Sequence, residues 1–252
     1  MDLLRRQRVV ILAALAAIAA LAWLYLFLAA ADMRAAMDSM DRAMVMPPRG
    51  PIELLLLFAM WWVMMVGMML PGVAPVILTF ATVNRNRRAR GEPYVPSALF
   101  TAGYLLAWGG FSLAATLAQE ALERAALLSP MDMTTNSRLL GGLLFLAAGL
   151  YQFTPVKLAC LRFCRSPLDF VVNHWREGAA GALRMGLTHG LYCLGCCWIL
   201  MLLLSVGGMM NLLWVAALAI VVLIEKLTAG PWIGRAGGVL LAAYGAWLIA
   251  TY

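Results

Sequence analysis

The sequence predicts an all-α protein, a polytopic transmembrane helix bundle of about seven spans with its N-terminus in the cytoplasm. Of its 252 residues, 64% are hydrophobic and 12% are charged, and the mean hydropathy is +0.86. Soluble domains carry about 45–50% apolar and about 25% charged residues, so this chain lacks the charge to cover a water-facing surface. The apolar runs are continuous, whereas the strands of a membrane barrel would alternate apolar and polar residues. These observations exclude soluble enzymes, disordered chains and disulfide-stapled secreted modules.

The predicted helices follow from the apolar runs, because a helix needs about 20 apolar residues to cross a bilayer. Seven stretches qualify, and they are 9–31, 54–82, 97–118, 139–156, 182–206, 211–228 and 233–251. The first follows three arginines and is longer than the apolar part of a signal peptide, which indicates an uncleaved anchor. Pro71 and Pro75 should kink the second helix. Gly186 and Gly190 in the fifth suit close helix packing.

The predicted loops differ in charge from one side to the other. Of the 19 lysines and arginines, 14 fall on the side of the N-terminus and five on the opposite side. The positive-inside rule then predicts a cytoplasmic N-terminus and an external C-terminus in a bacterial inner membrane. The net charge of +7 therefore indicates topology, and we expect the lipid bilayer and no nucleic acid as a partner.

The chain divides into two predicted regions. Residues 1–50 form the anchor helix and an external methionine-rich loop, and residues 51–252 form a six-helix membrane core with a Cys/His/Met cluster. The loop methionines are Met33, Met37, Met40, Met44 and Met46, interleaved with Asp38 and Asp41. This composition resembles the methionine-rich ligands of copper-handling proteins, but four of the methionines also have the spacing of one face of an amphipathic helix. Both interpretations stay open.

The fifth predicted helix carries a group of soft metal ligands, namely His189, Cys193, Cys196 and Cys197. At 100° per residue their side chains share one face about 100° wide. Thiolates and imidazole select Cu(I), Zn²⁺ or iron–sulfur centres over hard cations. Buried cysteines also pack as small hydrophobes. Because three cysteines and a histidine concentrate here, we favour a metal or redox role.

Three further features contribute candidate metal ligands. They are a methionine stripe in the second predicted helix, a cysteine pair in the fourth predicted loop, and Glu225 in the sixth predicted helix. Met60, Met64 and Met68 form an i, i+4, i+8 stripe whose thioethers suit Cu(I), although methionine also fills gaps in cores. Cys160 and Cys164 lie among basic residues, which promote the thiolate form. They either exchange metal at the cytoplasmic mouth or are plain interfacial cysteines.

Glu225 and Lys226 are intramembrane charges, which usually face a partner inside the bundle. Two arrangements are open. Glu225 either accepts the proton of His189 and orients its imidazole, or it meets Arg184 while Lys226 extends to the cytoplasmic headgroups.

Over about residues 55–230 the sequence resembles a bacterial family of predicted metal-binding integral membrane proteins, a domain of unknown function. The motifs that carry the resemblance are Met60-Trp61 with Met64, Met65, Met68 and Met69, Pro71 and Pro75, Gly149-Leu150-Tyr151-Gln152 with Pro155 and Lys157, Cys160 and Cys164, His189 to Trp198, and Glu225-Lys226. The resemblance implies a membrane metal site, and members of the family are described as copper-related.

The sequence thus predicts a protein that binds a soft metal near the bilayer midplane. The favoured metal is Cu(I), with zinc or another soft metal second. The predicted role is copper transport or delivery to a membrane cuproenzyme, with a metallochaperone as a further candidate partner. A membrane oxidoreductase that couples the cysteines or a bound metal to a quinone is one alternative. A structural or assembly subunit of a membrane complex is another.

Overall fold

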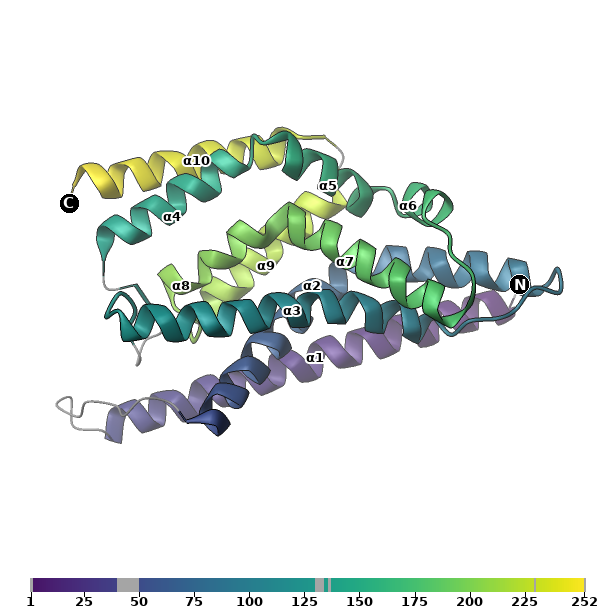
Figure 1. Ribbon diagram of the computed structural model, residues 1–252, viewed down its shortest axis with the longest axis horizontal. Coiled ribbons are helices and arrows are strands. Elements are labelled where there is room, and N and C mark those ends of the chain that lie inside the picture. The colour runs from purple at the N-terminus through teal and green to yellow at the C-terminus, as the bar shows by residue number, and fades with distance from the viewer. Residues whose placement is uncertain (1, 40–49, 130–133, 136, 229, 252) are drawn as a thin grey trace.

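The computed structural model describes residues 2–39, 50–129, 134, 135, 137–228 and 230–251, with side chains described from Arg6 to Met33 in the first helix. Within these residues every regular element is an α-helix, which confirms the predicted all-α class (Figure 1). The order is α1 (Asp2–Ser39), α2 (Pro51–Arg88), α3 (Ser97–Arg124), α4 (Arg138–Tyr151), α5 (Pro155–Arg165), α6 (Pro167–Asn173), α7 (Gly178–Leu202), α8 (Leu204–Gly207), α9 (Leu212–Leu227) and α10 (Trp232–Ala250). The methionine-rich loop is not assessed, because Met40, Met44 and Met46 and the side chain of Met37 lie outside the described part.

The described chain contains five helices that are long and apolar enough to cross a membrane. They cover Arg6–Met33, Pro51–Arg88, Ser97–Arg124, Gly178–Gly207 and Trp232–Ala250. The α4–α5 pair makes a sixth if the two bent helices are one span. The predicted sixth span corresponds to α9, which has 16 residues and is shorter than a span of about 20. The count of seven is therefore not confirmed, and the cytoplasmic N-terminus stays a prediction.

The predicted helix over 139–156 is in fact two helices. α4 ends at Tyr151 and α5 begins at Pro155, with a bend of 65° between them. Pro155 cannot donate a backbone hydrogen bond, but it is well suited to a first helical turn. Thr154 caps this new helix, because its hydroxyl accepts a bond from the backbone N of Lys157 at 3.3 Å. The bend turns α5 onto α7, where it contributes to the candidate site.

Glycines bring α3 and α7 into close contact. A Cβ atom built on Gly186 would lie 1.9 Å from the carbonyl oxygen of Phe100, and one on Gly103 would lie 2.1 Å from that of Leu183. Any larger residue at either position would push the two backbones apart. The predicted role of Gly186 in close packing is thus confirmed, and the contact fixes Tyr104 of α3 opposite the cysteines of α7.

α2 is one long helix that bends partway along its length (Figure 1). Pro71 and Pro75 lie inside it. Neither proline has an N–H group to complete the helical ladder, and each ring crowds the preceding turn, so both favour a bend. The bend of α2 therefore agrees with the kink predicted from its two prolines.

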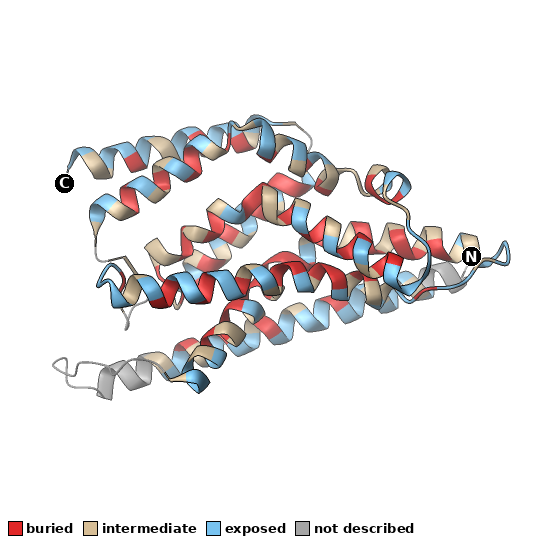
Figure 2. Ribbon diagram, in the orientation of Figure 1, coloured by how far each residue is buried: buried red, intermediate tan, exposed pale blue. Residues whose placement is uncertain are grey.

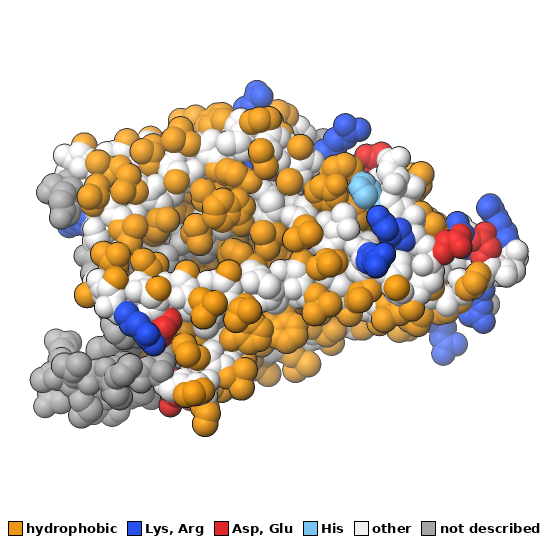
Figure 3. Space-filling view, in the orientation of Figure 1, with side chains coloured by type: hydrophobic (Ala, Val, Ile, Leu, Met, Phe, Trp, Pro, Cys, Tyr) orange, Lys and Arg blue, Asp and Glu red, His pale blue; other side chains and the backbone are white. Residues whose placement is uncertain are grey.

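Buried residues concentrate where α2, α3 and α7 meet, whereas α1 and α10 present many exposed side chains (Figure 2). The exposed side chains of these outer helices are largely apolar, including Leu21, Phe27, Leu240 and Trp247. In the space-filling view the hydrophobic side chains extend over most of the length of the molecule, and charged ones gather toward its ends (Figure 3). Apolar surface of this extent needs lipid or another protein to cover it.

Candidate metal centre

α7 places the predicted ligands on its buried face. His189, Cys193, Cys196 and Cys197 all lie within the regular helix and are all buried. Cys196 and Cys197 donate their S–H groups to the carbonyl oxygen of Cys193 at 3.0 and 3.1 Å. These bonds hold the two thiols against the helix backbone one turn earlier, at Cys193.

α5 brings a fourth thiol to this face. Cys164 Sγ lies 4.0 Å from Cys196 Sγ, and Cys164 is itself buried. We refer to Cys164, Cys193, Cys196 and Cys197 as the thiol cluster. All five cysteines of the chain are free. The cluster therefore offers several thiols from two helices in one buried region.

The ammonium group of Lys226 lies against two sulfur atoms. Its Nζ donates to Cys193 Sγ at 3.0 Å and to Met69 Sδ at 3.4 Å. Gly72 leaves room for the lysine, because a Cβ atom there would lie 3.2 Å from Lys226 Cδ. The lysine thus reaches from α9 to soft atoms of both α2 and α7.

Tyr104 completes the surroundings of Cys193 from α3. Its hydroxyl lies 3.1 Å from Cys193 Sγ and donates to the carbonyl oxygen of Met69 at 3.2 Å. Cys193 of α7 therefore contacts both the ammonium of Lys226 from α9 and the hydroxyl of Tyr104 from α3.

Glu225 pairs with a different lysine. Lys157 Nζ donates to Glu225 Oε2 at 2.6 Å, and the two residues are only 1% and 2% exposed. Arg165 Nε also donates to the carbonyl oxygen of Glu225 at 2.8 Å. Both arrangements expected from the sequence are therefore wrong, since Glu225 pairs with neither His189 nor Arg184. Lys226 is also buried rather than extended to the surface.

His189 lies in an aromatic pocket one turn before Cys193. The centroid of its ring is 4.7 Å from that of Phe170 and 6.0 Å from that of Tyr104. Its buried Nδ1 atom has no hydrogen-bond partner among the described residues. The imidazole thus keeps a free polar atom inside the protein.

The methionine stripe predicted on α2 lies on a different face of that helix from Met69, which contacts Lys226. Gly67 faces α1, because a Cβ atom there would lie 3.3 Å from a side chain of that helix. At about 100° per residue, Met60 and Met64 lie within about 60° of Gly67 around the helix, whereas Met69 lies about 160° away. Met68 lies between these directions. Met69 is thus the methionine brought to the thiol cluster, and a ligand role for the other three stays a prediction.

Cys160 lies beside the thiol cluster rather than in it. It is half-buried, and its Sγ would lie 2.7 Å from a Cβ atom built on Gly195, so it packs against the backbone of α7. Cys160 and Cys164, the pair predicted from the sequence, lie one turn apart on α5. Cys164 approaches the thiol cluster, and Cys160 lies at its edge.

No group of three or more His, Cys, Asp or Glu side chains in the described residues is arranged to hold a metal ion. Tyr104, Lys157, Met69 and Lys226 were not predicted from the sequence as site residues. Lys226 carried a signal, since a lysine within an apolar run usually has a buried partner. Lys157 carried none, because it follows the predicted helix over 139–156. Tyr104 and Met69 carried none, because only the packing of α2 and α3 on α7 brings them to Cys193.

No curated protein and no solved structure matches the chain significantly. A family model described as "PpoB2: Copper chaperone" matches residues 58–248. The matched range includes the whole thiol cluster, Met69, Tyr104, His189 and both buried lysines. The chain therefore belongs to the PpoB2 family of copper chaperones.

Proposed function

We propose that this protein is an inner-membrane chaperone that carries Cu(I) in the thiol cluster and delivers it to a copper-dependent enzyme. Membership of the copper chaperone family supports the metal. Thiolates and thioethers are the ligands that select Cu(I). The observation that carries the proposal is the ammonium of Lys226 against the sulfur atoms of Cys193 and Met69. It indicates a buried space among soft ligands that accommodates one positive charge.

The ligand set favours Cu(I) over Zn²⁺. Zinc sites in proteins are usually tetrahedral and need nitrogen, oxygen or thiolate ligands on several sides. Cys193, Cys196 and Cys197 all project from α7, and within the thiol cluster only Cys164 approaches from another helix. Cu(I) accepts linear and trigonal coordination and takes thioether sulfur as well. Cys193 with Cys164 or Cys196, and with Met69, therefore suits Cu(I) better.

Lys226 has a distinct role in this proposal. Its ammonium donates a hydrogen bond to Cys193 Sγ and would balance the negative charge of a thiolate there until copper binds. Copper then takes its place against the sulfur, and the flexible lysine side chain withdraws. Because the chaperone must also release its cargo, a displaceable cation at the site favours exchange over permanent storage.

The test is the affinity of the purified protein for Cu(I), measured anaerobically by competition with a chromogenic Cu(I) chelator. We compare the wild type with Cys193→Ala and with Cys160→Ala, the same substitution at the edge of the cluster. Loss of a supporting contact alone usually costs about 10–100-fold in metal affinity, so loss of Cys193 should cost at least about 100-fold. Cys160→Ala should change the affinity much less. Equal affinity of Cys193→Ala and the wild type would remove the thiol cluster from the proposal.

The membrane location is a separate part of the proposal. It is supported by the five helices of sufficient length and apolarity and by the apolar surface of α1 and α10. A reporter fused after Tyr252 should be active only outside the cytoplasm, because 14 of the 19 basic residues fall on the predicted side of the N-terminus. Activity of the fusion in the cytoplasm would contradict the predicted topology.

A further inference from the structure

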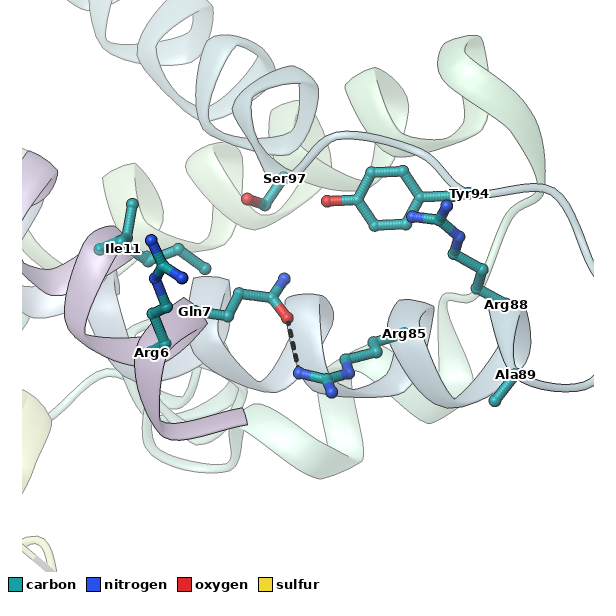
Figure 4. A pocket seen from close by; sticks show the side chains of 9 residues that line it. Arg6, Gln7, Ile11, Arg85, Arg88, Ala89, Tyr94 and Ser97 are labelled. Atoms are coloured by element: carbon teal, nitrogen blue, oxygen red, sulfur yellow. Dashed lines mark hydrogen bonds between the residues drawn. The ribbon is translucent and has the colours of Figure 1, made fainter. Parts of the chain in front are cut away.

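A second candidate site lies apart from the thiol cluster, where α1 begins and α2 ends. It is an open pocket of about 840 Å³, a size common for ligand pockets (Figure 4). Its lining residues are Arg6, Gln7, Val10, Ile11, Arg85, Arg88, Ala89, Tyr94 and Ser97. We refer to it as the basic pocket.

Three guanidinium groups line the basic pocket, and none of them pairs with a carboxylate whose side chain the structure describes. Arg85 Nη1 donates to Gln7 Oε1 at 3.4 Å, and the guanidinium of Arg88 lies 5.2 Å from the centre of the Tyr94 ring. Both contacts are with neutral groups. Among the side chains that the structure describes, none of Arg6, Arg85 and Arg88 forms an ion pair.

The neighbouring Arg87 shows that carboxylates are available at this end of the molecule. Its guanidinium pairs with Glu92 and, at 2.5 Å, with Glu177. Arg85 and Arg88, on either side of it in the sequence, face the basic pocket instead. Arg85 and Arg88 thus have no carboxylate partner among the described side chains, whereas the neighbouring Arg87 has two.

The opposite wall of the basic pocket supplies hydroxyl groups. Tyr94 lies on the segment between α2 and α3, and Ser97 is the first residue of α3 (Figure 4). Guanidinium and hydroxyl groups together match the oxygens of a phosphate group, which arginine can bind through two parallel hydrogen bonds.

One wall of the pocket is apolar and continues outward along α1. Val10 lines the pocket and is 60% exposed, and Ile11 lies beside it. Leu21, Leu24 and Leu28 are also exposed, and at about 100° per residue they lie within about 40° of Val10 around the helix. A ligand with a phosphate and a long apolar part therefore fits better than a free phosphate ester.

We propose that the basic pocket binds the phosphate headgroup of an anionic phospholipid, with an acyl chain along the exposed face of α1. Basic pockets between helices at the cytoplasmic end of a membrane protein are suited to such headgroups. This site is independent of the copper site but depends on the predicted insertion in the membrane. It would anchor the ends of α1 and α2 at the lipid surface.

The test uses the full chain in detergent, with lipid binding followed by native mass spectrometry. The probes are phosphatidylglycerol, phosphatidylcholine with the same acyl chains, and soluble glycerol phosphate. The pocket variant replaces Arg6, Arg85 and Arg88 by Gln. The matched control replaces Arg90, Arg162 and Arg184 by Gln, because these arginines are exposed, lie on the same predicted side and do not line the pocket.

The wild type and the control should bind phosphatidylglycerol at least about tenfold more tightly than phosphatidylcholine, since each basic residue near anionic lipid contributes about fivefold and the pocket has three. The pocket variant should lose this preference, while its helix content and Cu(I) stoichiometry stay unchanged. An equal loss in the control would show a general charge effect and overturn the proposal. Competition by glycerol phosphate as strong as that of the lipid would assign the pocket to a soluble phosphate ester instead. No preference of the wild type for the anionic lipid would also overturn the proposal, and would leave an acidic protein segment as the candidate ligand.

Discussion

Two buried lysines, Lys157 of α5 and Lys226 of α9, meet partners of different kinds. Lys157 pairs with the carboxylate of Glu225 at 2.6 Å, whereas Lys226 contacts the sulfur atoms of Cys193 and Met69 at 3.0 and 3.4 Å. The first pair joins α5 to α9 through hard, oppositely charged groups. The second leaves an ammonium against soft atoms that bind it less strongly than a carboxylate does.

The two contacts suit different roles, since one stabilises the structure around the site and the other can be exchanged for a metal ion. A buried ion pair is costly to break, because the remaining charge has no solvent around it. At Cys193 a bound Cu(I) would supply the positive charge that the ammonium gives up, so the sulfur is not left uncompensated. The Lys157–Glu225 pair is thus suited to fix the geometry of the site, and the Lys226–Cys193 contact is suited to be replaced by a metal ion.

The largest expected effect is on stability and comes from the ion pair. Glu225→Ala leaves Lys157 buried and unpaired, and we expect a loss of about 3–5 kcal/mol in the free energy of unfolding. The double variant Lys157→Met and Glu225→Leu should recover most of this loss, since apolar residues of similar volume often replace a buried pair at little cost. Thermal unfolding in detergent measures both. A double variant as unstable as the single one would show that the pair is not an isolated unit.

The next effect concerns metal selectivity and tests the role of Lys226. The charge of Lys226 stays inside the bundle after the side chain withdraws, and it repels Zn²⁺ by one charge unit more than Cu(I). Two charges about 8 Å apart interact by about 2 kcal/mol at an effective dielectric constant of about 20. Lys226→Met should therefore lower the preference for Cu(I) over Zn²⁺ at least about tenfold. Lys226→Arg keeps the charge and should keep the preference. Metal titrations of the three proteins measure the ratio, and an unchanged ratio in Lys226→Met would exclude an electrostatic role.

The smallest effect tests which face of α2 contributes to copper binding. Met69→Leu removes the thioether beside Lys226 and should weaken Cu(I) binding by about three- to tenfold, because thioether is a weak soft ligand. The double variant Met64→Leu and Met68→Leu is the comparison. Exchange of Met for Leu in a core usually costs less than about 1.5 kcal/mol, so both proteins should fold. A larger loss in the double variant would reverse this assignment and support the stripe predicted from the sequence.

The sequence predicted local features well and contacts between distant elements poorly. The helix through His189, Cys193, Cys196 and Cys197 could be predicted because its apolar periodicity and spacing are local. The family match also supports the predicted link to copper. The partner of Glu225 could not be predicted, because it depends on the break before Pro155 and on the bend that turns α5 onto α7.

The same reason explains why the methionine beside the thiol cluster could not be predicted. The sequence places Met64 and Met68 on one stripe of the helix and Met69 outside it, but the spacing does not indicate which side of the helix faces the cysteines. Their directions differ by the rotation of the helix, and only the packing of Gly67 on α1 decides which face is turned away from the cysteines. The number of spans was uncertain for a similar reason, since α9 is short and α4 is bent against α5.

The central claim is that the sulfur atoms around Cys193 hold Cu(I) in place of the ammonium. Copper K-edge X-ray absorption of the Cu(I)-loaded protein tests it most directly, with Cys193→Ala as the comparison. We expect copper coordinated by sulfur in the wild type, and loss of this sulfur coordination or of the bound copper in the variant. Coordination by nitrogen and oxygen alone, or an unchanged spectrum in Cys193→Ala, would contradict the claim.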